Sequence, residues 1–494
     1  MSNKPIGNQW KTLDSDLNRI SQFEYATAYV ARPLVAPGIA LAFIVVAALV
    51  GAVFFGQTPV SLVVVFAAAF GAYMAINIGA NDVANNMGPA VGAKALTMGG
   101  AILIAAVFES AGALLAGGDV VSTISKGIID PGGMQSARMF IWAMMAALIS
   151  SALWVNLATW IGAPVSTTHS VVGGVMGAGI AAAGFGAVNW PTMGAIAASW
   201  VISPLLGGAI AAGFLALIKE KIIYQEDKIA AARRWVPVLV AVMTGAFAAY
   251  LALKGFKRII KIDMGLALLI GLGLGVVAYF ITKPLIHRQS EGLENRNKSL
   301  KTLFGLPLVI SAALLSFAHG ANDVANAVGP LAAIVHATEF GNFSAKVAIP
   351  TWVMVIGAFG ISFGLFLFGP KLIRMVGSQI TKLNPMRAYC VALSAAITVI
   401  VASWLGLPVS STHIAVGGVF GVGFFREWHM ERRLRRMSAN PTVKRIAPEE
   451  RRRRKLVRRS HFMTIIAAWV ITVPAAALMS GMIFLALSAA VGAS

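Results

Sequence analysis

The sequence predicts an all-α integral membrane protein with about 11–12 transmembrane helices plus re-entrant half-helices, arranged as two inverted-topology repeats. Of its 494 residues, 58% are hydrophobic and 12% are charged, against roughly 25% charged residues in a typical soluble domain. Eleven apolar runs are long enough to span a bilayer, and they lack the alternating pattern of an outer-membrane strand. The runs lie near residues 36–56, 59–79, 99–118, 138–163, 190–218, 236–253, 263–285, 303–319, 346–369, 384–406 and 462–492.

Three short strings occur twice in the chain and in the same order. A duplication of this kind indicates an internal repeat. The pairs are GANDVANN at Gly79–Asn86 with GANDVANA at Gly320–Ala327, PVSTTH at Pro164–His169 with PVSSTH at Pro408–His413, and AASWVISP at Ala197–Pro204 with AAWVITVP at Ala467–Pro474.

These pairs divide the chain into four expected parts. The polar residues 1–35 lack the apolar core of a signal peptide, so we expect the first spanning helix to direct insertion. The single cysteine, Cys390, excludes a disulfide within one chain. The parts are an N-terminal cytoplasmic segment with an extra transmembrane helix (1–58), the first repeat (59–220), a connecting segment with two transmembrane helices (221–302) and the second repeat (303–494).

The charge pattern predicts that the two repeats insert in opposite directions. Residues 426–459 hold 14 Lys or Arg and 4 Glu, which is typical of a cytoplasmic loop and would also attract anionic lipid headgroups. The equivalent connection in the first repeat, Ala183–Pro191, carries no charge and is expected outside. The N-terminus would then be cytoplasmic and the C-terminus outside. The basic cluster 254–261 falls on the outer side and does not fit this scheme.

The two NDVAN strings place amide and carboxylate oxygens within the predicted membrane region. On a helix, the first Asn, the Asp and the last Asn of each string share one face. Hard oxygen ligands with one negative charge suit Na⁺, bound chiefly by the first Asn and the Asp, or a carboxylate that takes up a proton. The alternative is a helix cap after a break at Gly79 or Gly320. The candidate cation ligands are Asn81, Asp82, Asn85, Asn322, Asp323 and Asn326.

The PVSTTH and PVSSTH strings predict two helix starts. Proline ends the incoming helix, and the hydroxyl residues open a new helix whose first backbone N–H groups lack partners. Such a start carries positive partial charge and binds anions without Lys or Arg. The short, glycine-rich stretches that follow favour re-entrant half-helices, and the alternative is simple capping of a kinked helix. The candidate anion-binding residues are Ser166, Thr167, Thr168, Ser410, Ser411 and Thr412.

Ionisable residues beside these strings are weaker candidates. His169 and His413 end the paired strings and would support the hydroxyl groups. Glu109 is an ionisable residue at membrane depth, which indicates either a role in coupling or a packing contact with a buried hydroxyl or amide. The offsets of 241 to 244 residues between paired strings place its counterpart within Pro350–Val353, which contains no carboxylate. His319 precedes the second NDVAN string, and Ile78 stands at the matching place in the first.

The duplicated GANDVAN and PVS(S/T)TH strings closely resemble those of the inorganic phosphate transporter (PiT) family, which also includes sulfate permeases. The resemblance covers roughly residues 60–220 and 303–492. It implies a symporter that imports inorganic phosphate with Na⁺ or H⁺ by alternating access between inverted repeats. Phosphate would sit on the Ser/Thr segments and cations on the Asn/Asp segments. The resemblance also implies a homodimer in the lipid of the cell inner membrane, without a cofactor.

Other function classes fit the sequence less well. A sulfate permease of the same family remains an alternative function. A passive anion channel fits less well, because a channel needs no paired carboxylates and this chain has them. GISFG at Gly360–Gly364 matches the serine-hydrolase pattern but lies inside an apolar run, which argues against an enzyme. The sequence contains no G-x-x-x-x-G-K-[ST] loop for ATP. The formal charge of +21 is concentrated near one connection and does not indicate nucleic-acid binding.

Overall fold

The computed structural model describes most of the chain, and nearly all of it is helical. Within the described residues there is no strand, and Ile129 and Val188 form an isolated bridge. Eleven of the described helices are long and apolar enough to cross a membrane, one for each predicted apolar run. The chain is therefore a multi-pass membrane protein of the predicted all-α class. The described ranges are 34–55, 61–130, 134, 136–161, 165–255, 262–341, 349–379, 383–438 and 459–491.

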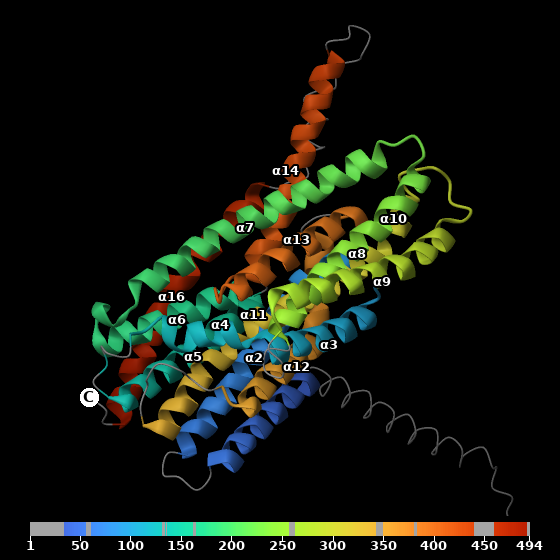
Figure 1. Ribbon diagram of the computed structural model, residues 1–494. Helices are drawn as coiled ribbons and strands as arrows, with labels where there is room; N and C mark the ends of the chain where they lie inside the picture. The colour runs from blue at the N-terminus through green and yellow to red at the C-terminus, as the bar shows by residue number, and fades with distance from the viewer. Residues whose placement is uncertain are drawn as a thin grey trace, which may run out of the picture.

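The helices follow one another without intervening domains (Figure 1). The first half contains the helix Leu34–Phe55, α2 (Ser61–Gly92), α3 (Met98–Ala116), α4 (Gly118–Ser122), α5 (Ala137–Ile161), α6 (Thr167–Ala183) and α7 (Trp190–Ile218). A hairpin of α8 (Lys228–Lys254) and α9 (Met264–Ser290) follows. The second half contains α10 (Leu300–Leu303), α11 (Gly305–Phe340), α12 (Thr351–Gln379), α13 (Pro385–Trp404), α14 (Ser411–Ser438) and α16 (Arg459–Val491). Single turns η1 (Thr123–Gly127), η3 (Phe185–Ala187) and η4 (Lys219–Ile223) join some of these helices.

Both GANDVAN strings lie inside continuous helices, α2 and α11, so the alternative of a helix cap after a glycine break is wrong. Their glycines instead allow a close helix crossing. A Cβ on Gly79 would lie 1.9 Å from the carbonyl oxygen of Ile361 in α12, and one on Gly320 would lie 2.1 Å from that of Glu109 in α3. Each string therefore packs against a helix of the other half.

Helices of the two halves also pack against each other beside the PVS(S/T)TH strings. Helix α6 packs along α16, and α14 packs along α7. Glycines again set the separation, because a Cβ on Gly177 would lie 2.1 Å from the carbonyl oxygen of Ala477, and one on Gly417 would lie 2.2 Å from that of Pro204. The halves are thus interlocked at four helix pairs.

The basic segment predicted as a loop over 426–459 is partly helical, which corrects that prediction. Helix α14 continues from the second PVSSTH string through Ser438 and projects from the body of the protein (Figure 1). Arg, Glu and Met have high helix propensity, so the charged sequence extends the helix that the hydroxyl residues begin. The helix α6 follows the prediction more closely, since it ends after 17 residues at Gly184, which has φ 77°. Residues 439–458 lie outside the described residues.

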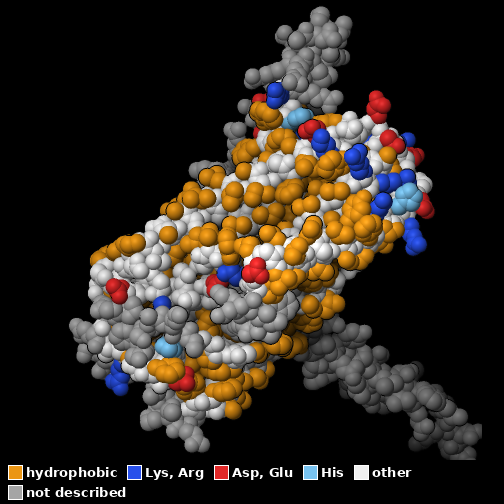
Figure 2. All heavy atoms as spheres, viewed as in Figure 1, with side chains coloured by type: hydrophobic (Ala, Val, Ile, Leu, Met, Phe, Trp, Pro, Cys, Tyr) orange, Lys and Arg blue, Asp and Glu red, His pale blue; other side chains and the backbone are white. Residues whose placement is uncertain are grey.

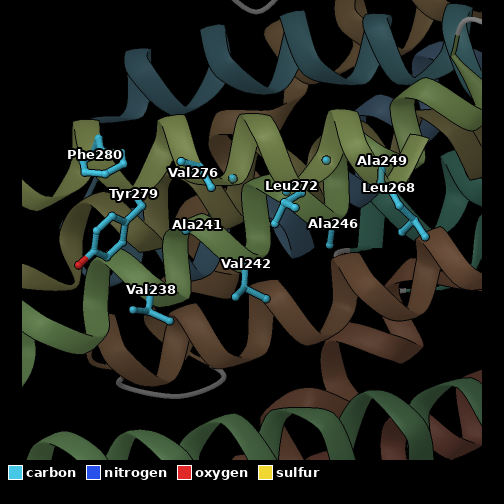
Figure 3. Close-up of a pocket in the computed structure, with 13 residues that line it drawn as sticks. Val238, Ala241, Val242, Ala246, Ala249, Leu268, Leu272, Val276, Tyr279 and Phe280 are labelled. Carbon is cyan, nitrogen blue, oxygen red and sulfur yellow. The ribbon is translucent and has the colours of Figure 1, made fainter. Parts of the chain in front are cut away.

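Hydrophobic side chains are spread along the body of the protein on the face shown in Figure 2, and the Lys, Arg, Asp and Glu side chains lie mainly toward its ends. The α8–α9 hairpin exposes apolar side chains, and an apolar groove of about 520 Å³ lies between the two helices (Figure 3). At the end of α8, Lys254 from the basic cluster 254–261 forms an ion pair with Asp119. Its charge is therefore matched within the fold, while residues 256–261 lie outside the described ranges.

Replacing Gly320 by Ala should destabilise the protein, because the added methyl meets the backbone of α3 and not a movable side chain. We expect a loss of about 1–3 kcal/mol, the usual cost of overpacking, measured as a lower thermal unfolding midpoint in detergent. Gly213→Ala in α7 is the matched control, since nothing lies within 4 Å of its Cβ position. Equal unfolding midpoints for the two variants would contradict the close crossing.

Candidate functional site

The two NDVAN strings and the two helix starts meet in the interior of the protein. Eleven of the twelve candidate cation and anion ligands are buried, and Asn85 is half-buried. The carboxylates of Asp82 and Asp323 are each 1% exposed. Hydrogen bonds bring Asp82, Asp323, Asn85 and Asn326 together with hydroxyl groups in the first turns of α6 and α14.

Both predicted helix starts are present and capped. The Ser166 side chain accepts a hydrogen bond from the backbone N–H of His169 at 3.1 Å, and the Ser410 side chain accepts one from that of His413 at 3.3 Å. These bonds satisfy one free N–H group at each start. Pro164 lies outside the described residues.

Each carboxylate accepts a hydrogen bond from the helix start of its own half. The Thr167 hydroxyl donates to Asp82 Oδ2 at 2.9 Å, and the Ser411 hydroxyl donates to Asp323 Oδ2 at 3.0 Å. Thr167 and Ser411 occupy the same place in the two paired strings. The predicted anion ligands and the predicted cation ligands are therefore in direct contact.

The last Asn of each string reaches the helix start of the other half. The Asn85 amide donates to the Thr412 hydroxyl at 2.8 Å, and the Asn326 amide donates to the Thr168 hydroxyl at 3.1 Å. The two bonds are equivalent by repeat position. Neither half can complete the site alone, because each supplies donors to the hydroxyl groups of the other.

The first Asn of each string is directed toward a flanking helix. The Asn81 amide donates to the Thr159 hydroxyl of α5 at 3.0 Å, and the Asn322 amide donates to the Ser403 hydroxyl of α13 at 3.1 Å. Sequence reasoning did not single out Thr159 or Ser403. Both lie near the end of the helix that leads into a PVS(S/T)TH string. This shared position in the two halves could have marked them as site residues.

His319 breaks the symmetry of the site. Its Nε2 lies 2.8 Å from Asp323 Oδ2 and 3.8 Å from Asp82 Oδ2, and its Nδ1 lies 3.3 Å from Glu109 Oε1. The Asn86 amide also donates to Glu109 Oε1, at 2.9 Å. One imidazole thus contacts three buried carboxylates. Sequence reasoning noted the asymmetry at His319 but left it and Asn86 out of the site.

The packing of Glu109 corrects its predicted counterpart. Gly320 packs against Glu109 as Gly79 packs against Ile361, so the equivalent residue is Ile361 and does not lie within Pro350–Val353. The prediction was wrong because α11 extends further beyond its NDVAN string than α2 does, and the connection to α12 is longer than the connection to α3. Glu109 still has no carboxylate counterpart in the second half, as predicted.

The serine of GISFG, Ser362, shares a 2.7 Å hydrogen bond with Ser110 of α3 and lies within helix α12.

His169 and His413 lie together on another side of the helix starts. Their ring centroids are 4.5 Å apart, and the Trp200 ring is 3.9 Å from that of His169. The Trp200 indole also donates to the Pro408 carbonyl at 3.1 Å, which ties α7 to the segment before α14. Both histidines line a groove that is otherwise mainly apolar.

The arrangement offers two kinds of chemistry at one place. Asp82, His319 and Asp323 hold ligand atoms within 4.8 Å of one another. Within the described part of the chain, Oδ1 of Asn322, Asp323 and Asn326 accepts no hydrogen bond. Buried oxygens of this type are suited to a hard cation. The neighbouring hydroxyls and helix starts are suited to an oxyanion.

Comparison with known proteins identifies the family. A model of the phosphate transporter family matches residues 78–480. The chain belongs to this family. Two relatives carry the name "Putative phosphate permease": one from Helicobacter pylori is 46% identical, covering 96% of this chain and 98% of its own, and one from Pyrococcus abyssi is 37% identical, covering 84% and 95%.

A solved structure of a protein named "The sodium-dependent phosphate transporter" also matches. It has a TM-score of 0.78 and 33% identity, covering 86% of this chain and 99% of its own. The family predicted from the repeated strings is thereby confirmed, and phosphate transport is the activity that the family supports.

The pair of Glu109 and His319 predicts a specific coupling in stability. Breaking a buried ionic pair leaves one partner uncompensated at a cost of about 3–5 kcal/mol. Glu109→Ile and His319→Ile should each lower the unfolding midpoint, and the double variant should lose less than the two losses together, because it installs the residues found at Ile361 and Ile78. Losses that simply add would show that the two side chains act independently.

Proposed function

We propose that this protein is a secondary active symporter that imports inorganic phosphate together with Na⁺. The observation that carries the proposal is the direct bonding of Thr167 to Asp82 and of Ser411 to Asp323. Anion and cation would then share side chains, so that occupancy of one site changes the other. Transport without a cofactor follows from this chemistry, since the gradient of the coupled ion supplies the free energy.

In this proposal the Asn and Asp side chains of the two strings hold the cation. Asn81, Asp82 and Asn85 act with their repeat equivalents Asn322, Asp323 and Asn326. The unpartnered oxygens of the second set provide ligands without breaking existing bonds. The sodium dependence for which the related transporter is named favours Na⁺ over H⁺. His319 would offset part of the charge of the two aspartates, and Glu109 would hold its imidazole in place.

Phosphate would lie at the paired helix starts. Thr167, Thr168, Ser411 and Thr412 supply hydroxyl donors, and Ser166 and Ser410 hold the first turns of α6 and α14 in place. Both turns direct positive partial charge toward the same centre. A bound cation would weaken the pull of Asp82 and Asp323 on the hydroxyls and free them for the anion. His169 and His413 would stiffen the pair of helix starts from the other side.

The interlocked halves favour alternating access. We propose that residues 59–220 and 303–494 are inverted repeats, joined by the hairpin within 221–302 and preceded by an extra helix within 1–58. Movement of the helix pairs that carry the NDVAN strings (α2–α12 and α3–α11) against those that carry the helix starts (α6–α16 and α7–α14) would open the site to either face of the membrane. We further propose a homodimer in the lipid of the cell inner membrane, with the N-terminus in the cytoplasm and the C-terminus outside.

Uptake of ³²P-phosphate into proteoliposomes under imposed Na⁺, H⁺ or no gradient tests this function. A Na⁺-coupled symporter concentrates phosphate only under the Na⁺ gradient. Accumulation under the H⁺ gradient alone would show that the coupled ion is H⁺ and not Na⁺. Equilibration without accumulation under every gradient would instead establish a passive anion channel.

Asp82→Asn and Asp323→Asn should each reduce accumulation to the level of empty liposomes. Each change removes a charge that a cation needs while nearly keeping the side-chain shape. Asp227→Asn is the matched control, because Asp227 caps α8 away from the site and Asn caps equally well. Wild-type accumulation by either site variant, with the folded protein recovered in equal amount, would remove that residue from the cation site.

Sulfate should compete poorly with phosphate at neutral pH. Monohydrogen phosphate carries a proton that needs an acceptor, and Asp82 or Asp323 beside the hydroxyls can accept it, whereas sulfate has no proton to give. We expect a difference in affinity of about tenfold or more, measured by competition in the uptake assay. Equal or better competition by sulfate would make this chain a sulfate permease.

A further inference from the structure

A large apolar groove opens between α7, α14 and α16. It encloses about 1180 Å³, which exceeds the roughly 300–1,000 Å³ of common ligand pockets. Val201, Leu205 and Val470 line it and are between 63% and 69% exposed. These three residues belong to membrane-spanning segments, so the surface that they expose faces lipid acyl chains and not water.

One end of the groove carries cations on its aromatic wall. The Lys219 ammonium lies 5.0 Å from the centroid of the Phe425 ring, and the Arg432 guanidinium lies 5.3 Å from that of the Trp428 ring. Both rings line the groove. Cation–π contacts hold a positive charge against an apolar surface. The groove therefore has an apolar body and a basic end.

The described part of the chain supplies no ion-pair partner for the cations at this end. Arg387 at the start of α13 and Arg426 of α14 lie close enough to Lys219 for their charges to repel its ammonium. None of these three cations, nor Arg432, forms an ion pair with a carboxylate among the described residues. Like charges gathered at a half-buried site favour an anion from outside.

We propose that this groove binds an anionic phospholipid, with acyl chains along α7 and α16 and the headgroup phosphate at Lys219, Arg387, Arg426 and Arg432. A zwitterionic lipid would bring a further cation to the cluster. Free phosphate would match the charges but leave the apolar body uncovered. A second copy of the chain is a poor source of anions, because it holds 19 Asp and Glu against 40 Lys and Arg.

The bound lipid would contact both crossed helix pairs that carry the helix starts. The groove is lined by Pro204 and Gly417 of the α7–α14 pair, and by Val473 of the α6–α16 pair. His169 and His413, which lie directly after the hydroxyl residues, also line the groove. The lipid site therefore adjoins the candidate transport site without including the side chains assigned to phosphate or Na⁺.

Native mass spectrometry of the full chain tests the basic end of the groove. The detergent-purified protein is titrated with phosphatidylglycerol or phosphatidylcholine of identical acyl chains in phosphate-free buffer. Lys219→Gln/Arg426→Gln should weaken phosphatidylglycerol binding by about tenfold to thirtyfold, as expected for two charges at a lipid surface. The matched control, Arg288→Gln/Lys301→Gln, removes two exposed charges elsewhere and should bind as the wild type does.

A second pair of variants tests the apolar body. Ala209→Trp places a large side chain in the groove and should reduce the binding of both lipids. Ala198→Trp is the matched control, because Ala198 is exposed on the same helix but does not line the groove. Unfolding midpoints equal to that of the wild type confirm that both variants are folded. A loss that is confined to Ala209→Trp supports the proposed site.

Three results would overturn the proposal. The first is equal affinity of the wild type for the two lipids, or an unchanged affinity in Lys219→Gln/Arg426→Gln. The second is displacement of phosphatidylglycerol by excess inorganic phosphate, which would identify the basic end as a site for the free anion. The third is a dimer that dissociates in Ala209→Trp, which would assign the groove to a second copy of the chain.

Discussion

The structure depends on keeping three carboxylates inside a membrane protein. Asp82, Asp323 and Glu109 are each at most 1% exposed, and an ion removed from water loses several kcal/mol of solvation even after the protein relaxes. His319 contacts all three. The hydroxyl groups at two helix starts and the amide of Asn86 supply further donors. Any arrangement of the helices that lost these contacts would leave an uncompensated charge in a nonpolar interior.

This constraint explains why the two halves are interlocked. Glycine at positions 79 and 320 lets α2 cross α12 closely and α11 cross α3 closely, so each helix that carries a buried aspartate packs against the other half. The amides of Asn85 and Asn326 then bond across the halves. Duplication provides the same set of groups twice, and the single imidazole of His319 lies between the two aspartates that a symmetric pair would leave facing each other.

Local features of the sequence predicted the spans, both helix starts and the residues that meet at the centre, because apolar length, proline and hydroxyl residues act locally. The pairing of the halves could not be predicted in this way, since it depends on which glycine faces which distant backbone. Ile361 was missed as the counterpart of Glu109 because a fixed offset between the halves does not hold in the segment directly beyond the NDVAN strings. The helical extension of α14 was missed because a run of arginines was interpreted by its charge alone and not also by its helix propensity.

The hydrogen bonds between the halves also determine which groups a bound ligand would have to compensate when the halves move apart. Any motion that separates α2 from α14 breaks the bond of Asn85 to Thr412 and the bond of Thr412 to Asp82. The Thr412 hydroxyl then loses these two partners, and the Asp82 carboxylate loses one of its donors. An anion alone satisfies the hydroxyl but repels the carboxylate. A cation alone satisfies the carboxylate but leaves the hydroxyl unpaired. In the proposed symport only the two together would compensate both groups, so joint binding would be favoured over separate binding.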